Sequence, residues 1–153
     1  MEVIRASATS RPAPQQRYSG VAWIGRDVTT LEPSRLSTFH AQFNPGARTA
    51  WHRYPYGRVL HVLHGTGRVQ RRGGPVHEVK AGDTIVVAPG EWHWHGAAPT
   101  TFVALVSTSE TDPDGPGTEW GAPVTDREYA SPPQSTAIRL PDQDRVPSRD
   151  PCW

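Results

Sequence analysis

GARTAWHRYPYGRVLHVLHG, residues 46–65, contains two apolar-rich segments joined by Pro55-Tyr56-Gly57. Successive side chains of a strand point to opposite faces, so His52 and Tyr54 share one face of the first segment. Proline fixes φ and glycine accepts a positive φ, and the joint therefore allows a tight connection between antiparallel strands. The sequence predicts that His52, Tyr54 and Arg58 point into one space.

A second stretch, GDTIVVAPGEWHWH at residues 82–95, repeats the arrangement, because alternation places His93 and His95 on one face. Imidazole is a common protein ligand for transition metals. The three side chains His52, His93 and His95 are therefore candidate metal ligands. The alternative from the residues alone is a set of buried, hydrogen-bonded histidines without a metal.

The spacing in both stretches resembles the paired motifs of the cupin superfamily. The first motif is matched by Gly46, five residues, His52-Arg53-Tyr54, three residues, Arg58, six residues and Gly65, and the second by Gly82, Pro89-Gly90 and His93. The resemblance spans about residues 20–130. The residues around the two motifs are similar to those of small monocupins, a group that includes bacterial manganese-dependent hydroxynitrile lyases. It implies that His52 and His93 are family-type metal ligands, whereas Tyr54 and Arg58 occupy two ligand positions with different chemistry.

Arg58 decides between the functions that these residues allow. A guanidinium stays charged and cannot ligate a metal, so at this position it would repel a divalent cation. In a metal-free enzyme Arg58 would hold an anionic or carbonyl oxygen of a small-molecule substrate. Tyr54 would then donate a proton or stabilise an oxyanion, and His52 or His93 would act as general base.

Three functions follow. The first is a lyase, isomerase or cyclase working by acid–base chemistry, metal-independent and belonging to bacterial specialised metabolism. The second is a metal-dependent lyase or oxygenase using one divalent ion (Mn, Fe, Ni or Zn). The third is a non-catalytic small-ligand-binding protein. The candidate catalytic residues are His52, Tyr54, Arg58, His93 and His95.

Composition excludes several classes of partner. The net charge of +1 over 153 residues gives no reason to expect nucleic acid or an anionic membrane. No apolar run approaches the roughly 20 residues of a membrane span, and residues 1–20 lack the apolar centre of a secretory signal. The one cysteine, Cys152, excludes an internal disulfide framework and favours a cytoplasmic location. The resemblance implies a homodimer that pairs through a sheet edge.

Sixteen prolines and fourteen glycines favour many turns over long helices. Short apolar segments punctuated by these residues predict a single-domain, all-β antiparallel barrel or jelly roll over residues 21–130. Residues 1–20 are predicted to form an N-terminal arm, either mobile or donated to a neighbouring subunit, and residues 131–153 a disordered Pro-rich tail.

Within the barrel, Gly65-Thr66-Gly67 is predicted to form a hairpin turn, and residues 125–129 the only helical turn. Trp51, Trp92 and Trp94 alternate with the histidines. They should therefore face the other side of the sheet or a dimer contact. Trp23 and Trp120 are expected at the mouth of the barrel, His61 on its outer face and His64 beside a turn.

Overall fold

The computed structural model describes residue 3 and residues 10–111 and 114–134, which form thirteen strands and one short helix. The elements are β1 (Arg11–Pro12), β2 (Tyr18–Ser19), β3 (Ala22–Ile24), β4 (Val28–Thr29), β5 (Leu36–Phe43), β6 (Arg48–Thr49), β7 (His52–Arg53), β8 (Arg58–Arg71), β9 (Val76–Lys80), β10 (Thr84–Val87), β11 (His93–Ala97), β12 (Val103–Glu110), β13 (Glu119–Trp120) and α1 (Asp126–Tyr129). All named strand pairs are antiparallel. The predicted all-β cupin-type fold is confirmed.

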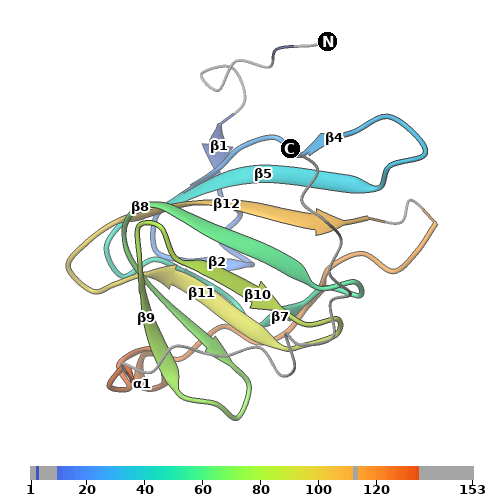
Figure 1. Ribbon diagram of the computed structural model, residues 1–153. Coiled ribbons are helices and arrows are strands. Elements are labelled where there is room, and N and C mark those ends of the chain that lie inside the picture. Colours follow the sequence, from blue (N-terminus) through green and yellow to red (C-terminus); the bar gives the residue numbers. More distant parts are fainter. Residues whose placement is uncertain (1–2, 4–9, 112–113, 135–153) are drawn as a thin grey trace, which may run out of the picture.

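The strands form two sheets that share β8 (Figure 1). The first sheet has the order β1-β3-β5-β12-β8-β10, with β4 also on β5. The second sheet contains the far half of β8 between β9 and β11, followed by β6 and β2, with β7 between β11 and β13. The two inner faces enclose the core and the candidate site.

The hairpin predicted at Gly65-Thr66-Gly67 is wrong, because β8 runs through these residues without turning back. Its first half pairs with β12 and β10, and its second half with β9 and β11. Gly65 has φ +80°, and a Cβ there would overlap the carbonyl oxygen of Phe102. The register with β12 shifts at Ala104/Leu105. This glycine bend therefore carries one strand from the first sheet into the second.

The Pro55-Tyr56-Gly57 joint forms the expected tight turn, but it does not connect two paired strands. Gly57 has φ +74°, and its N–H donates to the carbonyl of Tyr54 at 3.3 Å. The preceding β7 pairs with β11 and β13, whereas the start of β8 pairs with β10 and β12. The turn thus crosses from the second sheet to the first, and places residues on either side of it around one interior.

Two apolar clusters stabilise the sheets. The cluster between them contains Phe43, Leu60, Val62, Val103 and Leu105, with smaller alanines from both sheets. Burial of such side chains contributes about 1.5–3 kcal/mol each relative to full exposure.

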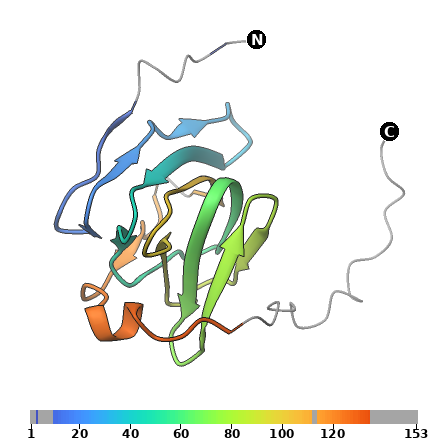
Figure 2. The same ribbon diagram turned by 90° about the vertical axis from the view of Figure 1, so that its left-hand side faces the viewer.

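The second cluster lies on the outer face of the second sheet and contains Trp51, Val76, Trp94, Val124 and Tyr129. The predicted outward orientation of the tryptophans is therefore confirmed, with the chain's own residues as their partners. A capping box between Thr125 and Glu128 begins α1, the orange-red helix of Figure 2, and this helix supplies Tyr129 to the cluster. The predicted helical turn is confirmed within one residue.

The described part of the N-terminal arm pairs with strands of its own chain. Arg11–Pro12 lies beside β3, and Tyr18–Ser19 lies beside β6. Both segments therefore extend the sheets below residue 21. Of the predicted disordered tail, residues 135–153 lie outside the described residues, while the N–H of Gln134 donates to the carbonyl of Val76 at 2.7 Å. Among described residues, no helix has the length and hydropathy to cross a membrane.

Candidate active site

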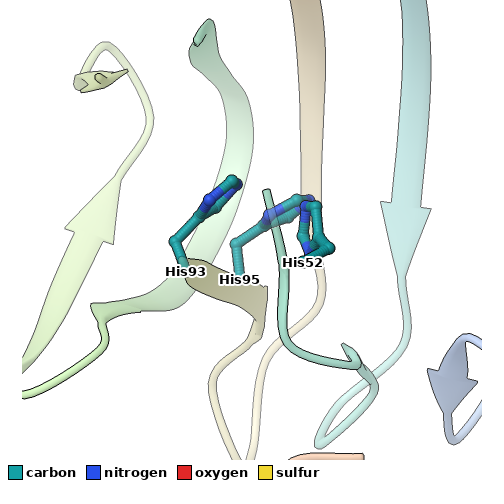
Figure 3. Close-up of side chains that lie close together, drawn as sticks. All are labelled: His52, His93 and His95. Carbon is teal, nitrogen blue, oxygen red and sulfur yellow. The ribbon is translucent and has the colours of Figure 1, made fainter. Parts of the chain in front are cut away.

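Three buried imidazoles meet between the sheets (Figure 3). His93 and His95 come from the inner face of β11, and His52 is the register partner of His93 on β7. The ring centroid of His52 lies 4.2 Å from that of His93 and 5.4 Å from that of His95. One ring nitrogen from each lies within 4.8 Å of the other two. The structure brings together the three histidines that alternation predicted.

Backbone carbonyls fix the tautomer of two of these rings. His52 Nδ1 lies 2.9 Å from the carbonyl of Ala50, and His93 Nδ1 lies 3.0 Å from that of Glu91. A carbonyl only accepts, so both Nδ1 atoms donate and both Nε2 atoms carry the lone pair. His93 Nε2 and His95 Nδ1 are buried without a partner among the described residues. They are the free polar atoms of the cluster.

Arg58 enters this cluster as a buried cation, with only 4% of its surface exposed. Its Nη1 lies 3.1 Å from His52 Nε2, and its Nη2 donates to Ser107 Oγ. The Cζ atom lies 4.2 Å from the centre of the Tyr54 ring. No ion pair joins Arg58 to a carboxylate within the described part of the chain, and its Nε–H has no partner there.

The electrostatics leave one positive charge among neutral rings. Burial, with the Arg58 cation as a further cause, lowers the pKa of His93 to about 3. Burial likewise lowers the pKa values of His52 and His95 well below the usual 6.5, helped by the neighbouring histidines and Arg58. All three imidazoles are therefore uncharged near neutral pH. The guanidinium remains the charged group of the site, although burial lowers the pKa of Arg58.

The donor set fits a metal only in part. Three imidazoles at this separation could hold one ion, and two of them offer an unpartnered ring nitrogen. However, the lone pair that His52 would give to a metal accepts the Nη1–H of Arg58. In this arrangement the third ligand is occupied and a cation lies beside it, so the residues do not fit a three-histidine metal site.

Sequence reasoning missed several neighbours of these residues. Ser107 is fully buried in β12, and its inward position in VALVSTSE is the one signal that could have singled it out. Trp120, expected at the mouth, stacks on His52 with the ring centres 4.8 Å apart. Tyr18 lies 5.9 Å from Trp120, and burial raises the pKa of Tyr18 to about 12. His61 is exposed, as predicted, and His64 is exposed as well.

Two antiparallel sheets with histidines on their inner faces define an all-β, barrel-like protein, and comparison with known proteins identifies its family. The pattern described as a cupin domain matches residues 39–107. The chain is 40% identical over 130 residues to an (R)-mandelonitrile lyase of Granulicella tundricola, covering 84% of this chain and 98% of that protein. This chain belongs to the cupins.

Solved structures agree on the fold. A cupin-like protein from Thermotoga maritima superposes with a TM-score of 0.73 and 32% identity, covering 84% of this chain and 95% of that one. The polyketide cyclase RemF from Streptomyces resistomycificus gives a TM-score of 0.65 at 15% identity, covering 84% and 90%, which shows the fold alone. The lyase relative, at 40% identity over most of both chains, supports a lyase-type cupin.

Proposed function

We propose that this chain is a small-molecule lyase, isomerase or cyclase that works by acid–base chemistry, with Arg58 holding an anionic or carbonyl oxygen of the substrate. The observation that carries the proposal is a buried guanidinium without a carboxylate partner in the described residues, beside three neutral imidazoles. An unpaired buried charge is costly, and a bound anion would remove that cost. Specialised metabolism and a cytoplasmic location remain part of this proposal.

Within this site His93 is the better placed general base. Its Nε2 carries a free lone pair, whereas the Nε2 of His52 already accepts from Arg58. Because the pKa of His93 lies near 3, its ring is unprotonated at neutral pH and can act as a base, although a weak one. An anion bound to Arg58 would cancel the cation that contributes to this lowering, and His93 would become more basic as the substrate binds. Tyr54, whose ring packs on the guanidinium, would donate the compensating proton.

For a cyanohydrin, the substrate class in the name of the Granulicella relative, these groups suffice for cleavage. The base would remove the hydroxyl proton while the carbon–carbon bond to the nitrile breaks. Cyanide would leave as an anion beside Arg58, and the carbonyl product would form. Mandelonitrile is therefore the first substrate to test, with benzaldehyde release as the measurement.

Substitution of Arg58 tests the proposal. We expect Arg58→Ala to weaken the binding of benzoate by more than about tenfold, since a charge-assisted contact is lost, and to change the binding of neutral benzamide little. Arg71→Ala removes the same charge from an exposed position of the same strand and should leave both affinities unchanged. Isothermal titration calorimetry provides the measurement. Unchanged benzoate affinity in Arg58→Ala would assign Arg58 a structural role.

A metal-dependent lyase or oxygenase is the second candidate, favoured by the closeness of His52, His93 and His95. In this case Arg58 would have to leave His52 when the ion binds. Metal analysis of the purified protein, together with turnover before and after treatment with a chelator, separates the two candidates. Ligand binding without any turnover would instead support the non-catalytic alternative.

We also propose that the chain forms a homodimer through the first sheet, whose edge strand is β10. The outward-facing side chains of β5, β8, β10 and β12 between residues 38 and 108 include no Asp, Glu, Lys or Arg: Thr38, His40, Gln42, Val59, His61, Leu63, Thr84, Val86, Ala104, Val106 and Thr108. A face without carboxylates, lysines or arginines can pack against its own copy without strong charge repulsion.

Light scattering after gel filtration measures the oligomeric state. We expect twice the chain mass for the wild-type protein and a monomer for Val59→Glu/Val86→Glu, which places two charges on neighbouring positions of this face. A monomeric wild-type protein at micromolar concentration would contradict the proposal.

A further inference from the structure

The guanidinium of Arg58 makes two hydrogen bonds and two aromatic contacts with neighbouring side chains. Its Nη1 donates to His52 Nε2, and its Nη2 donates to Ser107 Oγ. Its Cζ lies 4.2 Å from the ring centre of Tyr54 and 5.7 Å from that of Phe39. Each of these partners is uncharged, and Asp27, a carboxylate that acts on the cation electrostatically, forms no ion pair with it among the described residues. The contacts therefore fix the position of the cation without pairing it with a charge.

The two kinds of contact restrain different motions. Aromatic rings against a guanidinium limit its tilt, but they do not stop it from turning within its own plane. Rotation in the plane is restrained by the hydrogen bonds at the two Nη atoms. If the contact to Ser107 were lost, the bond to His52 alone would remain, and the guanidinium with its unpartnered Nε–H could leave its present orientation.

The side chains around Ser107 leave the guanidinium of Arg58 as the hydrogen-bond partner of its hydroxyl. It is fully buried on the inner face of β12, and its register partners are Phe39 on β5 and Leu60 on β8. Neither partner offers a polar side-chain atom. A buried hydroxyl needs a hydrogen-bond partner, and here the guanidinium supplies it.

We propose that Ser107 is a positioning residue that orients the guanidinium of Arg58, so that its unpaired Nε–H edge remains available to a substrate oxygen. This inference rests on the proposed function, because it assumes that Arg58 binds an anion. It extends the site to a strand that supplies none of the histidines, and it assigns a specific function to a buried serine.

A double-mutant cycle with benzoate as the probe tests the inference. We expect Ser107→Ala to weaken benzoate binding about fivefold in the presence of Arg58, because the guanidinium loses one of the two hydrogen bonds that orient it. In an Arg58→Gln background the same substitution should change the affinity less than about 1.5-fold, because no guanidinium remains to be oriented. Ser107→Thr, which keeps the hydroxyl, should retain most of the affinity.

Ser109→Ala is the matched control, because Ser109 is the next buried serine on the inner face of β12 and lies opposite Ser37. It should leave benzoate affinity unchanged, and thermal melting of every variant monitors folding. Equal losses from Ser107→Ala in both backgrounds, or the same loss from Ser109→Ala, would overturn the inference. If Arg58→Gln weakens benzoate while Ser107→Ala does not, the inference fails alone. If neither weakens it, the anion-binding function of Arg58 fails as well.

Discussion

Replacing Arg58 by glutamine and Tyr54 by histidine is expected to raise the affinity for Mn²⁺ by at least about 100-fold over the wild-type protein. The reason is visible in the contacts of His52, whose Nε2 lone pair accepts from Arg58 at 3.1 Å. Removing the guanidinium frees this lone pair. It also abolishes a repulsion that amounts to several kcal/mol for an ion about 4 Å away at an intermediate dielectric. The glutamine oxygen and the new imidazole would add two ligands.

The position of Tyr54 makes the second substitution productive. Its ring centre lies 5.8 Å from that of His52 and 6.5 Å from that of His93, so an imidazole placed there lies within reach of the same centre. Calorimetric titration with Mn²⁺ and electron paramagnetic resonance of the bound ion provide the measurements. Two controls separate ligand from charge: Tyr54→His alone and Arg58→Lys/Tyr54→His both keep the cation and should gain little.

The outcome also decides between the two candidate functions. If the double variant binds Mn²⁺ no better than the wild-type protein, then either Arg58 does not block His52 or the substituted side chains do not reach the ion. Tight Mn²⁺ binding by the wild-type protein would show directly that Arg58 leaves His52, and it would favour the metal-dependent candidate.

The resemblance placed His93 beside His52, and the pairing of β11 with β7 brings it there. The convergence of His52, Tyr54 and Arg58 could be predicted from the sequence itself because it depends on local rules. Alternation along a strand sets which side chains share a face, and a Pro-x-Gly turn keeps its two flanks close. These rules do not depend on which strands pair. The prediction therefore survived even though the turn connects two sheets instead of two hairpin strands.

The features that the sequence did not reveal depend on contacts distant along the chain. Gly65 resembles a turn residue locally, but its positive φ serves a bend against Phe102, which lies in another connection. Likewise, the hydroxyl of Ser107 contacts Arg58 only because β12 pairs with β8, and the sequence of β12 alone does not indicate this contact. Strand register across sheets is set by the assembled core, and no periodicity within either strand encodes it.

Acid is expected to destabilise the protein strongly between about pH 7 and pH 5, because the site keeps three histidines neutral. Burial holds the pKa of His93 near 3 in the folded protein, whereas an exposed histidine in the unfolded chain titrates near 6.5. The unfolded state therefore binds more protons below about pH 6.5, and the free energy of unfolding falls as the pH falls towards the folded pKa. For His93 the loss is about 2 kcal/mol at pH 5.

His52 and His95 add to this loss, since burial lowers their pKa values in the same direction. Because burial lowers all three pKa values in the same direction, the total loss exceeds the loss of about 2 kcal/mol from His93 alone. Urea unfolding at about pH 7.5 and pH 5, with metal removed by a chelator, measures the difference. His93→Gln should reduce the difference between these pH values by about 2 kcal/mol, because its coupled proton is gone.

His61→Gln is the matched control, because His61 is exposed and the substitution should leave the pH dependence of the unfolding free energy unchanged. An unfolding free energy that is equal at both pH values would mean that the folded protein protonates its buried histidines as readily as the unfolded chain does. A second positive charge would then lie beside Arg58, and the separation between one cation and three neutral bases would be lost. Proton uptake measured on the folded protein alone would identify that outcome independently.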